Sequence, residues 1–195
     1  MNKILISILG IILTIGVVSG TAYALFSDTA TVSGVTLTTG SADLKINDAD
    51  SLPAVALSTS NTYPGWIDGQ PFKLTNASTS PIALDVTSRI TSKTGSWTTL
   101  SPVVEVAIVE YSDAGQAAGA VAAKNPAAGT WTASTGWKSL ADWYAVTPTV
   151  IGTTIDQSTD HYFVMWGRIP TTAGNEISGL TVSTNWVLTG TQKTP

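Results

Sequence analysis

The chain has 195 residues, with 13 acidic and 9 basic side chains, a formal net charge of −4 and only 11% charged residues. Its 43% apolar content excludes disorder driven by charge, and clustered Lys and Arg are too few for an ordinary nucleic-acid partner. The absence of cysteine and the single histidine, His161, exclude disulfides, thiolate metal sites and histidine-rich zinc sites. The 31 Thr and 20 Ser favour strands and turns, so we expect an all-β protein. Because thiolate and histidine-rich sites are excluded, we expect no cofactor and no metal.

Residues 1–24 have the layout of a secretory signal peptide. A basic start and an apolar run precede a small-x-small pattern at Ala22 and Ala24, which predicts cleavage before Leu25. A retained anchor is the alternative, because the uncharged stretch 4–26 is long enough to cross a bilayer of about 30 Å. We favour cleavage, since no basic stop-transfer cluster follows. The protein is then secreted or at the cell surface, and it meets the membrane only through its precursor N-terminus.

Short alternating segments follow, separated by turn signals. The expected strands cover residues 25–32, 41–46, 71–76, 81–90, 103–111, 162–169 and 180–192. The strand 103–111 is apolar on both faces apart from Glu105 and Glu110, so we expect it inside a sheet. Turns are predicted at 63–65 and at Asp68-Gly69. About seven to nine strands at this spacing predict a jelly-roll-like β-sandwich with short helical insertions.

Two segments have helical composition. Residues 113–129 are rich in Ala, but Gly119 and the missing amphipathic period indicate a surface loop. Residues 139–144 are predicted to form one helical turn, with Ser139 as N-cap and Asp142 three positions later. We expect a single domain over 37–195, preceded by an extended segment over 25–36.

Few polar motifs suggest chemistry. His161 is either a general base or a polar residue at a strand edge, and we favour the strand edge because no nucleophile signature accompanies it. Asp48 and Asp50 could supply oxygens to Ca²⁺, but the spacing lacks the glycine and distal glutamate of an EF-hand, which favours a solvated acidic loop. Asn76-Ala77-Ser78 fits the N-glycosylation acceptor pattern.

Seven tryptophans are the most unusual content of the chain, and Trp131, Trp137 and Trp143 lie close together in its least regular part. They form either a surface patch that stacks on glycans or the cover of one end of the core. We favour the cover, because tryptophan is usually largely buried.

Two stretches, taken in order, resemble a known family. Gly20 to Asp28 followed by Ser41 to Ile46 has the pattern of a signal peptide that runs into an aromatic-Ser-Asp segment and then into Gly-Ser-Ala-Asp-Leu. Residues 63–65, 72–76 and 81–86 then give a Pro-Gly turn and two strands. Together they resemble the TasA/camelysin family of secreted matrix-fibre proteins, whose signal peptides are handled by a SipW-type peptidase. Near the C-terminus, residues 169–170, 174–176, 179–182 and 191–192 also fit, so the match brackets the mature chain and is weakest over 87–160.

The resemblance implies a jelly-roll subunit of extracellular fibres or biofilm matrix. In such fibres an N-terminal strand of one copy inserts into a groove of the next, so the partners would be a second copy of this chain, the signal peptidase, and other matrix proteins or polysaccharide. By position, the donor strand would contain Leu25, Phe26, Asp28, Ala30 and Val32, with Phe26, Ala30 and Val32 filling the groove. In the alternative, this segment pairs within its own domain.

One camelysin-like member has been described as a metallopeptidase. A zinc peptidase needs about three protein ligands and a general base, and one histidine without cysteine leaves only carboxylates here. We therefore expect a structural protein that is not an enzyme. The alternatives are a monomeric surface module that holds glycans on exposed tryptophans, and a hydrolase with His161 as its base.

Overall fold

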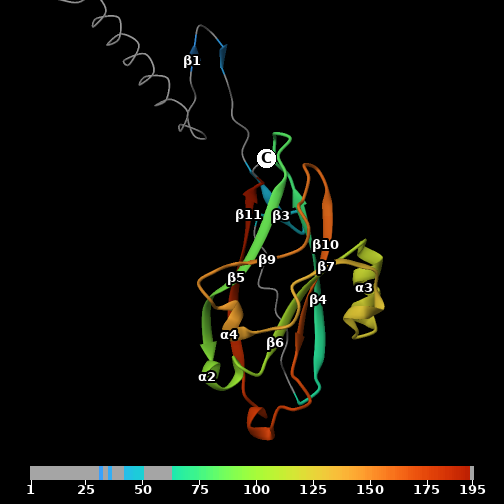
Figure 1. Cartoon of the computed structure of the whole chain (residues 1–195), viewed down its shortest axis with the longest axis vertical. Helices are drawn as coiled ribbons and strands as arrows, with labels where there is room; N and C mark the ends of the chain where they lie inside the picture. Colours follow the sequence, from blue (N-terminus) through green and yellow to red (C-terminus); the bar gives the residue numbers. More distant parts are fainter. Residues whose placement is uncertain (1–30, 33–34, 37–41, 51–62, 194–195) are drawn as a thin grey trace, which may run out of the picture. The chain divides into compact units, whose positions relative to one another are not determined.

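The computed structural model describes residues 31–32, 35–36, 42–50 and 63–193. The chain divides into two compact units, residues 1–40 and 41–195. In the first unit, strands β1 (Thr31–Val32) and β2 (Val35–Thr36) form a short antiparallel ladder. The second unit contains two larger sheets, which Figure 1 shows together with their helices.

Six strands form an antiparallel sheet, the large sheet. Its order is β3 (Leu44–Ile46), β4 (Ile67–Asn76), β10 (Asp160–Arg168), β6 (Glu105–Tyr111) and β7 (Trp131–Ser134), and β8 (Lys138–Ser139) also pairs with β6. Strand β6 therefore has partners on both sides, which confirms the prediction that this segment lies inside a sheet.

Three strands form the second antiparallel sheet, the small sheet, in the order β11 (Val182–Gln192), β5 (Leu84–Gly95) and β9 (Thr149–Val150). The ladder between β11 and β5 is the longest in the described residues and contains a register shift at Asn185/Trp186. Two antiparallel sheets with few short helices confirm the expected all-β sandwich.

The main core lies between the two sheets. Phe72 of β4, Ile108 of β6 and Phe163 of β10 are buried there with Val86 and Ile90 of β5. The rings of Phe72 and Phe163 stack with their centroids 5.3 Å apart. Since side chains alternate along a strand, the neighbours of these residues face the other side of the large sheet.

A nine-residue helix, α3 (Ala114–Ala122), covers that other side, and the prediction of a surface loop there is wrong. Asp113 caps the helix, because its side chain accepts a hydrogen bond from the Gln116 amide. Ala117 and Ala120 are buried in a second cluster with residues of β6 and β10. A cap and two small side chains three residues apart thus suffice to dock a helix without a strong amphipathic period.

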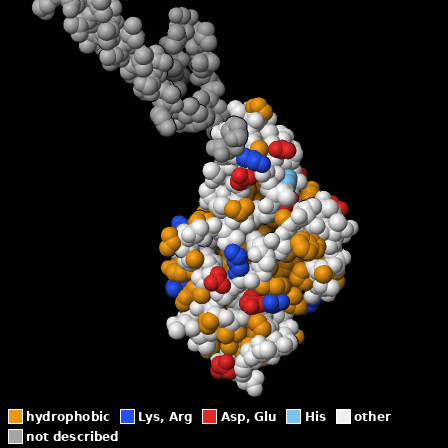
Figure 2. Space-filling model, viewed as in Figure 1, with side chains coloured by type: hydrophobic (Ala, Val, Ile, Leu, Met, Phe, Trp, Pro, Cys, Tyr) orange, Lys and Arg blue, Asp and Glu red, His pale blue; other side chains and the backbone are white. Residues whose placement is uncertain are grey.

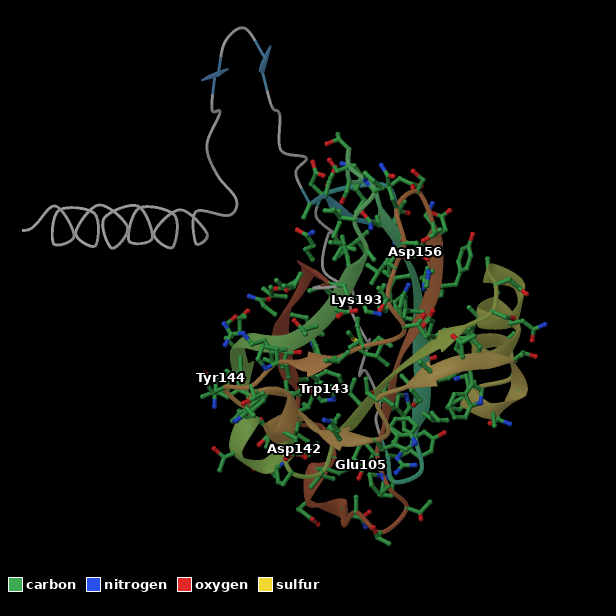
Figure 3. The ribbon with its side chains drawn as sticks, turned by 45° about the horizontal axis from the view of Figure 1, so that its top comes forward. Glu105, Asp142, Trp143, Tyr144, Asp156 and Lys193 are labelled. Atoms are coloured by element: carbon green, nitrogen blue, oxygen red, sulfur yellow. The ribbon has the colours of Figure 1, made fainter. Side chains whose placement is uncertain are left out.

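Four further short helical elements lie in the described connections: α2 (Trp97–Leu100), α4 (Leu140–Trp143) and the 3₁₀ turns η1 (Pro126–Ala128) and η2 (Asn175–Ile177). Of these, α4 was predicted. Ser139 and Asp142 form a reciprocal capping box at the start of α4. The turn directs Trp143 into the core at 1% exposure, whereas Tyr144 remains 40% exposed (Figure 3).

The two predicted turns have different outcomes. Residues 63–65 do turn, with the Trp66 amide bonded to the Tyr63 carbonyl and Gly65 at a φ of 89°. Asp68-Gly69, however, lies inside β4, so the predicted turn there is wrong. A Cβ at Gly69 would come within 2.8 Å of the Trp166 ring, and this close approach explains the glycine.

Candidate functional site

Most of the N-terminal residues with a predicted role lie outside the described residues. This applies to the cleavage residues and to most of the donor segment, namely Ala22, Ala24, Leu25, Phe26, Asp28 and Ala30. Val32 lies in β1, where it pairs with Val35. None of the helices in the described part of the chain is long and apolar enough to cross a membrane.

The small sheet ends in a long edge strand. Over its 11 residues β11 pairs with β5, and no other described strand pairs with it. Half-buried side chains, among them Trp186 and Leu188, alternate along β11 with exposed ones such as Val187. Such a strand presents a row of main-chain N–H and C=O groups to one side, which is a template for pairing with another chain.

The other edges among the described strands are short or interrupted. Strands β3, β7 and β9 have only three, four and two residues. Strand β4 is longer, and its partner β3 covers only Leu74 to Asn76. The rest of this edge is interrupted by Pro71. Proline lacks an N–H, so it blunts an edge, and β11 contains no proline. Strand β9 pairs with only Thr87 and Ser88 of β5 (Leu84–Gly95), so residues 89–95 of β5 form a second, shorter edge that no described strand covers. With 11 residues, β11 is the longest pairing edge in the described structure.

The region beside β11 also leaves apolar side chains partly uncovered. Val182, Trp186 and Leu188 of β11 and Leu44 of β3 pack against the core without being fully buried. The two sheets approach each other near Gly190, where an added Cβ would lie 3.3 Å from the Leu44 side chain. A strand placed along β11 would thus find both unpaired main chain and apolar surface.

A buried carboxylate lies at one end of the main core. Glu110 of β6 is 4% exposed, and its oxygens accept hydrogen bonds from the Thr153 amide at 2.6 Å and the Thr153 hydroxyl at 2.9 Å. Nδ1 of His161, on the neighbouring strand β10, lies 2.6 Å from Glu110 Oε1. Burial alone would raise the pKa of Glu110, but the hydrogen bonds from His161 and Thr153 outweigh it and hold this pKa below its ordinary value.

This cluster joins the two sheets. Thr153 lies in the connection after β9, and its neighbours Ile151 and Ile155 bond to the main chain of β5 in the small sheet. His161 is thus held by the buried acid Glu110, a partner that was not predicted from the sequence. A signal was present, because alternation places both Glu110 and His161 on the inward side of their strands.

The three clustered tryptophans do not form one patch. Trp143 is buried in the core, where its indole N–H donates to the Val106 carbonyl at 2.9 Å. For this residue the favoured core position is therefore observed, and the alternative of a surface patch is wrong. Trp131 is 52% exposed on β7, and Trp137 is partly buried against the α3 side of the large sheet. Only these two flank a common cavity.

The acidic loop after β3 is tied down by lysines. Lys45 bonds to Asp50 at 2.6 Å and Lys73 to Asp48 at 2.7 Å, and these hydrogen bonds raise the pKa of both lysines. The loop is therefore ion-paired, and its two carboxylates face lysines.

The glycosylation pattern at Asn76 is contradicted by the fold. Asn76 is fully buried, and its Nδ2 donates to the carbonyls of Ile82 and Ile155 at 2.8 and 2.9 Å. Ser78 is buried as well. Nδ2 is the atom to which a glycan is attached, so in the folded chain this atom is both inaccessible and already bonded.

Comparison with known proteins concerns the N-terminal part of the chain. The model of a family described as camelysin metallo-endopeptidase matches residues 1–95, which confirms the predicted resemblance over this part of the chain. A search of curated proteins finds no match. The matched region ends with strand β5, so Glu110, His161 and β11 lie beyond it.

The match corrects one expectation. We expected a chain that is not an enzyme, and the family's description as a metallo-endopeptidase contradicts this. A metallopeptidase implies a bound metal ion, for which about three ligands are needed. Within the described ranges no three His, Asp or Glu side chains lie close enough to hold one. The described residues therefore do not fit such a site.

Proposed function

We propose that this chain, whose residues 1–95 match the camelysin family, is exported and serves as a structural subunit of extracellular fibres. In this proposal the segment 25–32 of one copy, freed by removal of the signal peptide, pairs with strand β11 of the next copy. The observation that supports it best is the edge of β11, which is long, free of proline and unpaired among the described strands.

The segment and the edge agree in length. Eight residues of extended chain span about 27 Å, and the 11 residues of β11 span about 37 Å, at roughly 3.4 Å per residue. The donor is therefore shorter than β11 and can pair along its whole length with it. Its main-chain groups would bond to those of β11, and Phe26, Ala30 and Val32 would face the partly covered apolar side chains.

This contact leads to a filament. The donor and acceptor are different surfaces of one chain, so each added copy offers the same free edge again, and the assembly does not close. Strand pairing also protects an edge that would otherwise invite unspecific aggregation. On the face drawn in Figure 2, charged side chains are few and scattered, so like-charge repulsion opposes lateral packing of filaments only weakly.

Export is supported by the layout of residues 1–24, with a basic start, an apolar run and small residues at Ala22 and Ala24. We propose cleavage before Leu25, after which the donor segment becomes the N-terminus. N-terminal sequencing of the protein recovered from the culture medium tests this, and a start at Leu25 is the expected result.

Negative-stain microscopy of two purified proteins, residues 25–195 and 33–195, tests the polymerisation. Only the longer protein is expected to form filaments, and an excess of a peptide with the sequence of 25–32 should stop their growth where a scrambled peptide does not. The shorter protein keeps the whole second compact unit, residues 41–195, so we expect it to fold, and circular dichroism checks this. Filaments from both proteins would contradict the proposal.

A matched pair of substitutions tests the face of the donor. Phe26→Asp removes the proposed groove-filling ring and adds a second carboxylate to the face that already carries Asp28, so it should abolish filaments through the lost apolar contact and the desolvated charge. Ser27→Asp adds the same charge on the opposite face and should leave them intact. Equal behaviour of the two variants would exclude the proposed orientation of the strand.

A further inference from the structure

A small apolar cavity lies on the side of the large sheet that carries α3. Its volume is about 160 Å³, and its walls come from β6, η1, β7 and the loop that follows, with Ala107, Val109, Pro126, Trp131, Ser134 and Trp137 among them. An apolar cavity of about 150 Å³ is large enough for one benzene-sized ring. The cavity is therefore of the size of a single six-membered ring.

The walls of this cavity are held in place. The hydroxyl of Tyr111 donates to the Pro126 carbonyl at 2.8 Å and accepts from the Trp166 indole N–H at 3.1 Å. The Thr130 amide, just before β7, donates to the Gln116 side chain of α3 at 3.0 Å. The segment between α3 and β7 is thus anchored from two directions, so the cavity exists before a ligand enters.

Trp137 is oriented by a charged pair outside the cavity. The Arg168 guanidinium lies 4.1 Å from the centroid of the Trp137 ring, and its Nε donates to Glu105 at 2.6 Å. The cation is therefore neutralised, and it fixes the indole. None of the residues that line the cavity is acidic, basic or a histidine, so the ligand that suits it is uncharged.

Trp131 supplies an accessible aromatic wall. It is 52% exposed on a four-residue edge strand, although tryptophan is usually largely buried. Ser134 lies on the same strand, and its hydroxyl oxygen accepts only the Gly136 amide among the described groups, which leaves its O–H to be donated. Apolar walls with a few polar groups at the rim are the usual composition of a small-ligand site.

We propose that the Trp131–Trp137 cavity binds one neutral hexopyranose ring of a polysaccharide. A pyranose with equatorial hydroxyls has flat faces of C–H groups that pack on indole rings, and hydroxyls at its rim that bond to groups such as Ser134. A proline-rich peptide is a worse fit, because its recognition uses a groove for prolines several residues apart rather than a cavity for one ring. The site does not depend on polymerisation, since β11 belongs to the other sheet.

Binding of cellohexaose and of chitohexaose to the protein 25–195 tests the proposal, with tryptophan fluorescence and calorimetry as the readouts. Titration to about 5 mM detects a millimolar dissociation constant. At least one hexaose should bind, Trp131→Ala should weaken binding at least fivefold, and Trp131→Phe should restore part of it. Because the ligand is neutral, affinity should change less than twofold between about 50 and 500 mM NaCl.

Tyr144→Ala is the matched control, since it removes a 40% exposed aromatic ring that does not line the cavity. It should leave the affinity unchanged, and circular dichroism should show all three variants folded. The proposal is overturned if neither hexaose binds, if Trp131→Ala and Tyr144→Ala have equal effects, or if decaproline binds more tightly than both hexaoses.

Discussion

Glu110 shows how one residue joins two layers of the fold. Its carboxylate accepts hydrogen bonds from Thr153 and lies against His161, and Thr153 belongs to a segment bonded to the small sheet. Replacing it by glutamine puts an amide against donors that need an acceptor. We expect Glu110→Gln to lower the free energy of unfolding at pH 7 by about 1.5–3 kcal/mol, the usual worth of a hydrogen bond to a charged group, as measured by urea denaturation.

The effect has a defined pH dependence. The pKa of Glu110 is lowered in the folded chain, so its contribution to stability is fully present above the ordinary glutamate pKa, about 4.3, and is lost as the pH falls through the lower folded value. The difference in free energy of unfolding between wild type and Glu110→Gln should therefore become smaller as the pH falls from about 5 to about 3. This range extends about one unit to either side of the ordinary pKa. Glu176→Gln, at an exposed position, is the control. A stability difference between wild type and Glu110→Gln that stays constant with pH would contradict this role of Glu110.

Asn76 is a second residue whose role depends on burial. Its Nδ2 satisfies two buried carbonyls, and its Oδ1 accepts from the Ser78 amide at 3.1 Å. Asn76→Ala removes these three hydrogen bonds and leaves the Ile82 carbonyl and the Ser78 amide without a described partner, whereas the Ile155 carbonyl keeps its bond from the Leu84 amide. Thermal and urea unfolding should therefore show a loss of at least about 2 kcal/mol. Asn185→Ala, which removes an exposed hydrogen bond to Ser92, should cost less than about 1 kcal/mol. Equal costs would mean that burial is not what matters at Asn76.

At the scale of elements, two glycines should respond in opposite ways to alanine. Gly119 lies inside α3, where an added Cβ meets nothing within 4 Å, so Gly119→Ala should raise stability by about 0.5–1 kcal/mol through helix propensity. A Cβ added at Gly69 would lie 2.8 Å from the Trp166 ring, so Gly69→Ala should lower stability by about 1–3 kcal/mol through overpacking. Differential scanning calorimetry measures both, and a stabilising Gly69→Ala would contradict the packing of β4 on β10.

The elements found from the sequence are those with a clear period. The pattern located β6, β10 and β11 within a few residues, because β11 alternates over most of its 11 residues and β6 and β10 have mainly apolar centres. Helix α3 was missed because its docking face consists of two alanines, which carry no hydrophobic period. The predicted turn at Asp68-Gly69 is wrong because the glycine has another cause. It makes room for the Trp166 ring of β10, a strand that is far away in sequence but pairs with β4.

At the scale of the whole molecule, the sequence predicted the sandwich but not the free edge of β11 or the cavity beside Trp131 on which the proposals rest. Edges cannot be read from a strand's own residues, because they depend on the order of strands in the sheet. The cavity beside Trp131 likewise needs β6, η1 and β7 together, and Trp143, which is close to Trp131 in sequence, lies in the other cluster. What the sequence did predict is the resemblance, which the family match confirms over residues 1–95.

Hydrogen–deuterium exchange tests the central claim, that β11 accepts a strand from another copy, most directly. The amides of β11 should exchange markedly more slowly in filaments of residues 25–195 than in monomers of 33–195, and the peptide 25–32 should slow them in the monomer as well. Amides of β7, an edge strand of the other sheet, serve as the internal reference and should not change. Filaments in which β11 exchanges as fast as in the monomer would contradict the account.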